Sequence, residues 1–569
     1  MNGFWQVHPS DAVSLLLAKK ITLLFCLIAV PCLASAQALP QSISPGQIEK
    51  RFEPQPLPQS RGGRFELRED EALPSEQAGA IRFELKQLLI EGRSAIALDA
   101  LKPLYADLLG REVSLMDIYR VRDAITAYYR NAGYLLVRAL IPAQDISSGT
   151  VRLLIIEGAL NQVRISGTDS GGRIAAYAKK LQDSKPLRAD DFERYVLLMD
   201  DLPGVKVRAV LSPSAGDALG SDLDLVVEPD RVAAGLSLGN RGTREIGPVQ
   251  LYGSVDLSNL QQRQERTSLG VAVAAPIEEL RYVSVRHTEL LGAEGTSLSL
   301  GYSDSLAHPG GNLKPLDIAS QGQSLSIELS HPLWRARSKT LRLNASLKGS
   351  NNTVEALDTE LSNDQVRIAG LGADLDFADR LGGRNLISLQ LARGLKGLGA
   401  SSAKASNLSR LGGQPDFFRS NLSLLRQQPF ADAWTLTLGL DGQWSPDVLL
   451  SSEQYAVGGE AYGHAFDPSA IAGDRGYGAR LELAYRVRAE LPRLKQLELF
   501  ATTDGGGVYS QGVAAPGEWE SIHSAGAGLR FQVGPYLFGT LEADKAMDVD
   551  SGSRYDRSWR FFYNLRAAL

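Results

Sequence analysis

Between Arg231 and Leu569, one segment after another alternates between apolar and polar side chains. Side chains of a β-strand point to opposite faces in turn, so this period of two predicts strands with one apolar and one polar face. The pattern covers more than half of the chain and is clearest at residues 297–303, 324–330, 341–348, 434–441 and 481–490. A β-sandwich with a shared core and a transmembrane β-barrel with an apolar outer face both show such alternation.

The start of the chain favours the barrel. Lys19–Lys20 precede an apolar run, Ile21–Leu33, and the small residues Ala34–Ala36 follow, which is the order of a secretory signal peptide cleaved after that triplet. The apolar run is shorter than the ~20 residues that a membrane-spanning helix needs. Both cysteines, Cys26 and Cys32, fall inside this segment, so the exported chain would fold without disulfides.

In an exported chain, the alternation is better explained by apolar side chains that face lipid. With ~21 residues for each strand and its connection, Arg231–Leu569 holds about 16 strands, an even number as in bacterial outer-membrane barrels. Phe561–Leu569 is itself strand-like, so we expect the C-terminus to close the barrel. The 56 glycines and the slightly negative mean hydropathy argue against a helical membrane protein.

One connection in this region is unusually long. Residues Leu449–Tyr477 separate the alternating segments Trp434–Trp444 and Arg480–Leu491 and show no strand pattern of their own. Loops of this length are usually functional or disordered. This one carries four aromatic side chains and a glycine pair that permits close packing of the backbone. We therefore predict that it folds back into the barrel lumen.

Two α/β modules precede the predicted barrel. Ile81–Gly158 has the order strand–helix–helix–strand–strand, and Asn161–Pro229 repeats it in shorter form. A proline-rich linker comes before them, in which Pro45–Phe52 is a candidate helix with Ser44 as its N-cap. The predicted domains are a signal peptide at 1–36, the linker at 37–80, modules at 81–158 and 159–229, and the barrel at 230–569.

Both modules resemble polypeptide-transport-associated (POTRA) domains. The first contains YRNAGY (Tyr129–Tyr134), PAQD (Pro142–Asp145) and IIEG (Ile155–Gly158), and the second contains LLMDDLPGV (Leu197–Val205). With the barrel and its loop, the chain is similar to the outer-membrane transporters of two-partner secretion (TpsB type), which export filamentous-haemagglutinin-like adhesins and haemolysins. The resemblance implies structural or client-binding roles for Gly133, Tyr134, Pro142, Gln144, Gly158, Leu202, Pro203 and Gly204.

The resemblance also implies that Leu449–Tyr477 is the family's sixth extracellular loop, whose tip arginine pairs with an aspartate of the inner wall. Here the tip reads GHAF (Gly463–Phe466), so His464 stands at the arginine position and Asp504 is the implied aspartate. A histidine would make the pairing weaker and sensitive to pH near neutrality, and Arg475 is an alternative partner of Asp504. The implied loop residues are Gly458, Gly459, His464, Phe466, Asp474, Arg475, Gly476 and Tyr477, and the implied wall residues are Asp504, Gly506, Gly526 and Gly528.

The chain shows none of the sequence patterns of an enzyme or a metal site. Its six histidines lack metal-ligand spacing, and neither a Gly-x-Ser-x-Gly elbow nor a phosphate-binding loop is present. We therefore expect no catalysis, no metal and no cofactor. The net charge of −5 gives no support to nucleic-acid binding.

The resemblance implies an outer-membrane pore that secretes an unfolded exoprotein. Its periplasmic POTRA domains would bind the client by β-augmentation, in which an extended segment adds a strand to a sheet edge, and residues 45–52 would plug the pore. The expected partners are one large secreted client and outer-membrane lipid, and we expect a monomer. The alternative is an assembly factor for outer-membrane proteins, whose main bacterial type carries more POTRA domains. A small-solute porin would not need these modules.

Overall fold

The computed structural model describes residues 39–58, 64–67, 81–92, 95–214, 220–488, 492–512, 517–548 and 557–568. The predicted signal peptide and Leu569 lie outside these ranges. The chain divides into two units, Met1–Pro40 and Gln41–Leu569, and every element below belongs to the second. No helix within the described ranges is long and apolar enough to cross a membrane.

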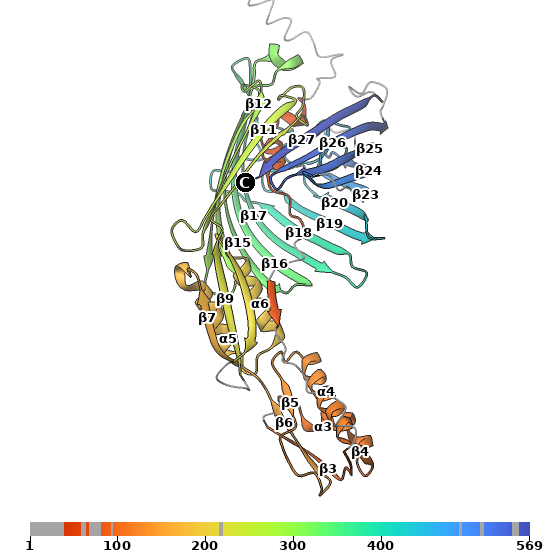
Figure 1. The fold of residues 1–569 in the computed structure, drawn as a ribbon. Helices are drawn as coiled ribbons and strands as arrows, with labels where there is room; N and C mark the ends of the chain where they lie inside the picture. The colour runs from red at the N-terminus through yellow and green to blue at the C-terminus, as the bar shows by residue number, and fades with distance from the viewer. Residues whose placement is uncertain are drawn as a thin grey trace, which may run out of the picture. The chain divides into compact units, whose positions relative to one another are not determined.

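Sixteen of the described strands form one closed antiparallel barrel (Figure 1). The wall begins with β10 (Val232–Gly239) and ends with β27 (Trp559–Ala568), and these two strands pair to close it. This confirms the predicted all-β barrel of about 16 strands. The strands between are β11 (Val249–Ser258), β12 (Arg266–Ala275), β13 (Arg281–Leu291), β14 (Thr296–Ala307), β15 (Ile318–Arg335), β16 (Lys339–Ala356), β17 (Thr359–Ala378), β18 (Arg384–Gly394), β19 (Phe418–Phe430), β20 (Trp434–Trp444), β23 (Arg475–Val487), β24 (Leu494–Tyr509), β25 (Trp519–Val533) and β26 (Leu537–Asp548).

The barrel wall exposes apolar side chains and buries polar ones. On β15, Leu325 is 60% exposed, whereas its neighbour Ser324 is 6% exposed. A water-soluble sandwich would bury the apolar face instead. The observed orientation therefore fits a barrel whose apolar face meets lipid and whose polar face lines a lumen.

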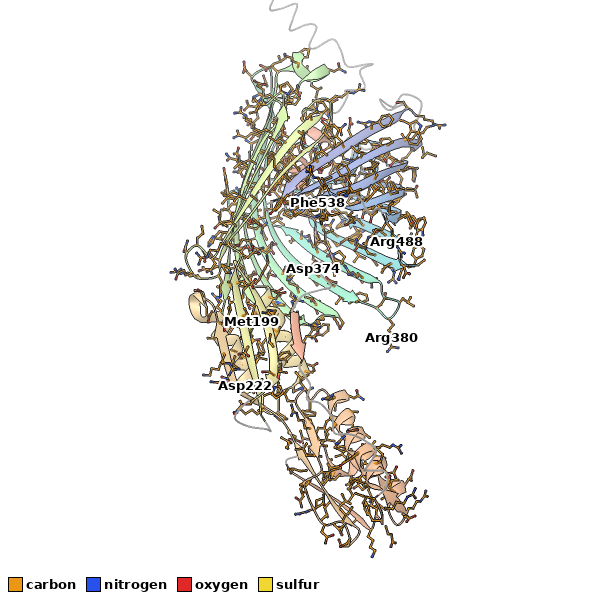
Figure 2. The ribbon with its side chains drawn as sticks, in the orientation of Figure 1. Met199, Asp222, Asp374, Arg380, Arg488 and Phe538 are labelled. Carbon is orange, nitrogen blue, oxygen red and sulfur yellow. The ribbon has the colours of Figure 1, made fainter. Side chains whose placement is uncertain are left out.

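The longest connections of the barrel lie at the end opposite to the chain's entry, although the turn at residues 357–358 of that end is short. At the end where the chain enters, the connections are as short as residues 336–338 and 431–433, whereas residues 395–417 and 445–454 are connections at the other end. Arg380, between β17 and β18, and Arg488, just after β23, lie at strand ends on the short-turn side (Figure 2). Short turns face the periplasm and long loops the exterior in barrels of this kind.

The first α/β module contains five strands, two more than predicted. Its elements are β2 (Arg82–Glu84), β3 (Gln87–Glu91), α3 (Leu98–Leu101), η2 (Lys102–Leu104), η3 (Ala106–Leu108), β4 (Glu112–Ser114), α4 (Leu115–Asn131), β5 (Arg138–Leu140) and β6 (Thr150–Ile156). The first predicted strand is divided because Leu85 donates its N–H to Arg111 whereas Lys86 donates to Gly149. As a result β2 pairs with β4, and β3 joins a three-stranded sheet in the order β3-β6-β5.

The second module has the predicted order and gains a strand from the linker. Its elements are β7 (Leu160–Ser166), η4 (Ser170–Gly172), α5 (Arg173–Asp183), α6 (Ala189–Asp200), β8 (Val205–Pro213) and β9 (Ser221–Pro229). Met199 of α6, labelled in Figure 2, is fully buried in its core. Strand β1 (Arg64–Leu67) pairs in parallel with β8, so the prediction of a linker without strands was wrong here. The resulting sheet order is β1-β8-β9-β7.

Candidate functional site: the occupied barrel lumen

A short helix lies inside the barrel wall and contacts the long loop. Helix α2 (Pro45–Phe52) follows the turn η1 (Gln41–Ile43) and is drawn in red among the barrel strands (Figure 1). Proline at its first position fits the helix start, although the side chain of Ser44 makes no capping hydrogen bond. Gln47 donates its side-chain amide to the carbonyls of Ser451 (3.2 Å) and Gln454 (3.1 Å) in the loop.

The opposite contacts of α2 are with the wall and are mostly polar. Glu49 accepts hydrogen bonds from Ser303 on β14 (2.9 Å) and Ser324 on β15 (2.5 Å), and it pairs with Lys348 on β16 at 3.0 Å. Phe52 stacks on Tyr282, with ring centroids 4.9 Å apart. Three neighbouring strands thus hold one carboxylate of the helix.

The long loop was predicted to contain no strand. It contains a two-stranded sheet. Strands β21 (Tyr455–Val457) and β22 (Ile471–Gly473) pair antiparallel. Tyr455, Val457, Phe466 and Ile471 are buried in one cluster with Val508 and Ile522 of the wall. This packing stabilises strands of only three residues, which leave too little alternation in the sequence to be recognised.

The loop tip is held by a wall carboxylate. Asp504 on β24 accepts hydrogen bonds from the backbone N–H groups of Gly463 and His464, the latter at 3.0 Å. The same oxygen lies 2.7 Å from Nδ1 of His464, and its other oxygen accepts from Ser524 at 2.5 Å. His464 and Asp504 are both buried. The structure therefore brings the two sequence-identified residues together, and the backbone contributes as much as the histidine.

Two glycines shape the approach to this tip. Gly458 and Gly459 have φ angles of +120° and +95°, which side chains disfavour. A side chain at Gly458 would also collide with the carbonyl of Asp467, on the returning part of the loop. The glycine pair noted in the sequence thus permits a reversal with two backbone segments in contact.

Asp474 and Arg475, which begin the second motif implied for the loop (Asp474–Tyr477), lie at the base of the loop, away from Asp504. Asp474 is buried, pairs with Arg410, and accepts backbone hydrogen bonds from Leu449 (2.7 Å) and Gln511 (2.6 Å). Arg475 donates to the carbonyl of Ser445 and the side chain of Gln511. The alternative pairing of Arg475 with Asp504 is therefore not found.

Strand β23 begins at Arg475, so the loop ends earlier than predicted. Gly476 and Tyr477 belong to this strand rather than to the loop. Tyr477 is 48% exposed, and its ring lies 5.6 Å from that of Trp519. The placement of Tyr477 in the pore loop was wrong, because its aromatic ring faces outward from the wall.

The predicted wall glycines allow close contact between neighbouring strands and side chains. A side chain at Gly506 would collide with the carbonyl of Tyr477. One at Gly526 would meet the carboxylate of Asp544, and one at Gly528 would meet the carbonyl of Leu541. Packing in the wall therefore requires glycine at these three positions.

Three motif residues of the first POTRA module contact residues 187–189 of the second module, and one contacts a strand of its own module. Gly133 accepts a hydrogen bond from Ala189 at 2.8 Å, Tyr134 forms a β-bridge with Arg188, and Gly158 accepts from Leu187. Gln144 forms two hydrogen bonds with the backbone of Arg152 on β6, and its amide also donates to the carbonyl of Pro142.

The second motif lies next to the start of the barrel. Leu202, Pro203 and Gly204 follow α6; Leu202 is buried in the module core, and Gly204 accepts from Asp230 at 2.9 Å. A side chain at Gly204 would collide with Asn259, in the turn after β11. Most of these motif residues thus make contacts between the two modules or between the second module and the barrel. Their contact with a client is a separate proposal.

The described residues contain no group of three or more His, Cys, Asp or Glu side chains arranged to hold a metal ion. The site is instead a lumen that contains two segments, α2 and the loop, which are held by hydrogen bonds, ion pairs and one small apolar cluster.

Known proteins are similar to this chain in sequence and in fold. Residues 220–531, more than half of the chain, match the haemolysin secretion/activation protein family ShlB/FhaC/HecB, and residues 83–158 match the ShlB-type POTRA domain. The heme/hemopexin transporter protein HuxB of Haemophilus influenzae (strain 86-028NP) is 24% identical over 526 residues, 89% of this chain and 91% of that protein. The outer membrane transporter CdiB of Escherichia coli O6:K15:H31 (strain 536 / UPEC) is 26% identical over 520 residues, 86% and 85% of the two chains.

Solved structures agree on the fold. CdiB from Escherichia coli matches over 100% of both chains with a TM-score of 0.71 and 21% identity. BamA from Haemophilus ducreyi, lacking POTRA domains 1–3, matches with a TM-score of 0.52 and 11% identity over 86% of this chain and 100% of that one. The resemblance to two-partner secretion transporters is thereby confirmed. With its outer-membrane barrel and periplasmic POTRA modules, the chain belongs to the haemolysin secretion/activation family ShlB/FhaC/HecB.

Proposed function

We propose that this transporter captures one large unfolded exoprotein with its POTRA modules and passes it outward through the barrel after the loop and α2 leave the lumen. The observation that carries the proposal is the occupied lumen. Glu49 of α2 is held by Ser303, Ser324 and Lys348, and the loop tip by Asp504. A plug held mainly by polar contacts can leave, because water and lumen side chains replace its hydrogen bonds at small net cost.

The free sheet edges support client binding by β-augmentation. In the first module, β3 and β5 are the outer strands of the three-stranded sheet. In the second, β8 is covered by β1, and the outer strands are β1 and β7. Main-chain pairing at such an edge tolerates many client sequences, which suits a chain that passes in extended form.

Several finer points belong to the same proposal. The first module spans residues 81–158, the second 159–229 and the barrel 230–569, preceded by a cleaved signal at 1–36. The protein acts as a monomer in outer-membrane lipid, carries no catalytic activity, and needs no metal or cofactor. The pairing of His464 with Asp504 supports the assignment of these two residues as a lock of the pore loop.

A gene deletion tests the proposal. Proteins of the culture medium and of the outer membrane are compared between cells with and without this gene. Loss of one large secreted protein, with other barrels unchanged, is the expected result and identifies the client. A general fall in outer-membrane barrels would contradict it and favour an assembly factor for outer-membrane proteins.

A further inference from the structure

Two arginines of the wall reach the loop tip from either side of the barrel seam. Arg241 follows β10, the first strand of the barrel, and Arg560 belongs to β27, the last. Arg241 donates to the carbonyl of His464 at 3.0 Å, and Arg560 donates to the carbonyl of Ala465 at 2.7 Å. Consecutive carbonyls of the tip thus accept hydrogen bonds from the two strands whose pairing closes the barrel.

The seam is short, and its regular pairing ends just below these arginines. The regular pairing of the two strands is limited to residues Gly235–Gly239 of β10, which pair with residues Asn564–Ala568 of β27. Beyond Gly239, the side chain of Asn240 continues the seam by donating to Phe561 (2.9 Å) and accepting from Tyr563 (2.8 Å). At the next residue, Arg241 lies over the ring of Phe562 on β27, 4.1 Å from its centroid, and the two sides of the seam are also connected through the loop tip.

The charges at this point are arranged so that the arginines hold the tip firmly. Arg560 also pairs with Asp467 of the loop at 2.6 Å, and the side chain of Asp467 is 8% exposed. Arg241 is fixed by Glu542 (2.6 Å) and Asp544 (3.2 Å) of β26. A partly buried guanidinium that is oriented by carboxylates has its remaining N–H groups directed, which favours a defined contact with a carbonyl.

We propose that Arg241 and Arg560 are positioning residues that hold the loop tip across the β10–β27 seam, so that the wall supplies cations where the tip side chain is a histidine. This inference rests on the proposed role of the loop as a movable plug. Release of the tip would remove the hydrogen bonds that link the two arginines through consecutive carbonyls, whereas the direct contact of Arg241 with the ring of Phe562 would remain.

The test uses the purified full-length protein without a client. In the parent variant A465C, the new thiol replaces a side chain that is 1% exposed, and its rate of labelling by a water-soluble maleimide reports loop release. The variant R560Q removes both contacts to the loop, each a charge-assisted hydrogen bond, and should label at least about tenfold faster. R560K keeps the charge but cannot span both acceptors, so its rate should be intermediate.

Control variants separate this effect from general damage. R566Q changes another arginine of β27, for which no contact with the loop is found among the described residues, and should label at the parent rate. The double variant R241Q/E542Q removes the second arginine together with its closest carboxylate, and it should also label faster. Heat-modified mobility of each variant verifies that the barrel remains folded.

Equal labelling of R560Q, R241Q/E542Q and the parent would overturn the inference. Secretion is measured separately. Faster labelling of R560Q with unchanged client secretion would leave the two arginines as loop anchors and would refute the loop as a gate. If deletion of the gene abolishes secretion but R560Q and R241Q/E542Q label at the parent rate, the role of the two arginines as anchors is refuted and the proposed function is not.

Discussion

At the loop tip, Asp504 anchors the backbone as well as one side chain. It accepts from two backbone N–H groups, from Ser524 and from His464. A buried carboxylate with four donors is well stabilised. The two partners of this lock are therefore unequal, since Asp504 keeps three donors without the imidazole, whereas the tip loses all three of its bonds to the wall carboxylate without Asp504.

This inequality gives a prediction for single-channel recordings in planar lipid bilayers. H464A removes one charge-assisted hydrogen bond, roughly 1.5–3 kcal/mol, and should raise the ratio of open to closed time by about tenfold or somewhat more. D504A removes the whole set and should raise that ratio clearly further. T503A, at the exposed neighbouring position on β24, should behave as the parent protein. Equal effects of H464A and D504A would show that the backbone contacts do not hold the tip.

Sequence reasoning identified this carboxylate but not the arginines that act with it. Asp504 and His464 were found through motifs of related loops. Arg241 follows strand β10 and Arg560 lies in β27, neither in a recognisable motif, and their contacts join residues more than 200 and about 95 positions apart. Nothing local in the sequence distinguishes such an arginine from one in a hydrated lumen, so only the folded barrel could reveal it.

Among the elements, α2 depends on its single buried carboxylate. Glu49 pairs with Lys348 at 3.0 Å, whereas Glu53, just after the helix, is 3.5 Å from the same ammonium and 52% exposed. Loss of one member of a buried ion pair leaves the other charge without compensation. Exposed pairs contribute little.

We therefore expect E49Q to release the helix and E53Q to leave it in place. Both substitutions remove one negative charge near Lys348, so they form a matched pair. E49Q should increase the mean bilayer conductance severalfold, and E53Q should change it slightly. If the two variants conduct alike, the net charge of the lumen rather than the helix position controls conductance.

Helix α4 of the first module has a defined N-terminus. Ser114 and Asp117 form a capping box, in which Ser114 N–H donates to the Asp117 carboxylate at 2.9 Å. That backbone hydrogen bond is the main reason why the pKa of Asp117 lies below its usual range. The stabilisation is therefore present above the usual pKa of an aspartate and is lost as the pH falls through the lowered value.

D117N should destabilise α4 by about 1 kcal/mol at neutral pH. The loss is measured as faster hydrogen exchange of the α4 amides in the full-length protein. D123N, at an exposed carboxylate of the same helix, should have an effect within about 0.5 kcal/mol. The difference between D117N and the parent should begin to shrink below about pH 4, where Asp117 of the unfolded chain takes up a proton, and should vanish once the pH falls below the lowered pKa of the folded state. A difference that persists in acid would rule out the capping box as its source.

The long strands were predictable, and the shortest ones were not. The alternation at Leu325–Ser330 predicted a strand because one face meets lipid and the other the lumen. β1 has four residues, β21 and β22 three each, and all of them depend on pairing or packing with distant parts of the chain. Such strands leave no periodic signal in the sequence, which is why the linker and the loop were predicted without them.

In the whole molecule, a closed barrel wall surrounds two segments that we propose move during transport. The wall is closed by backbone hydrogen bonds around the complete ring. The lumen holds α2 and the loop, which contact each other through Gln47 and the carbonyl of Gln454. Passage of an extended chain thus requires movement of both segments and no break in the wall beyond the seam contacts.

A reversible covalent tie between loop and wall tests this most directly. His464 and Asp504 are in side-chain contact at 2.7 Å, and both natural cysteines lie in the predicted signal peptide. H464C/D504C therefore offers one new disulfide, and each single variant is its control. Secretion of the client should stop when the pair is oxidised and return on reduction, while both single variants secrete under either condition. Undiminished secretion with the disulfide fully formed would contradict a mechanism in which the loop must leave the wall.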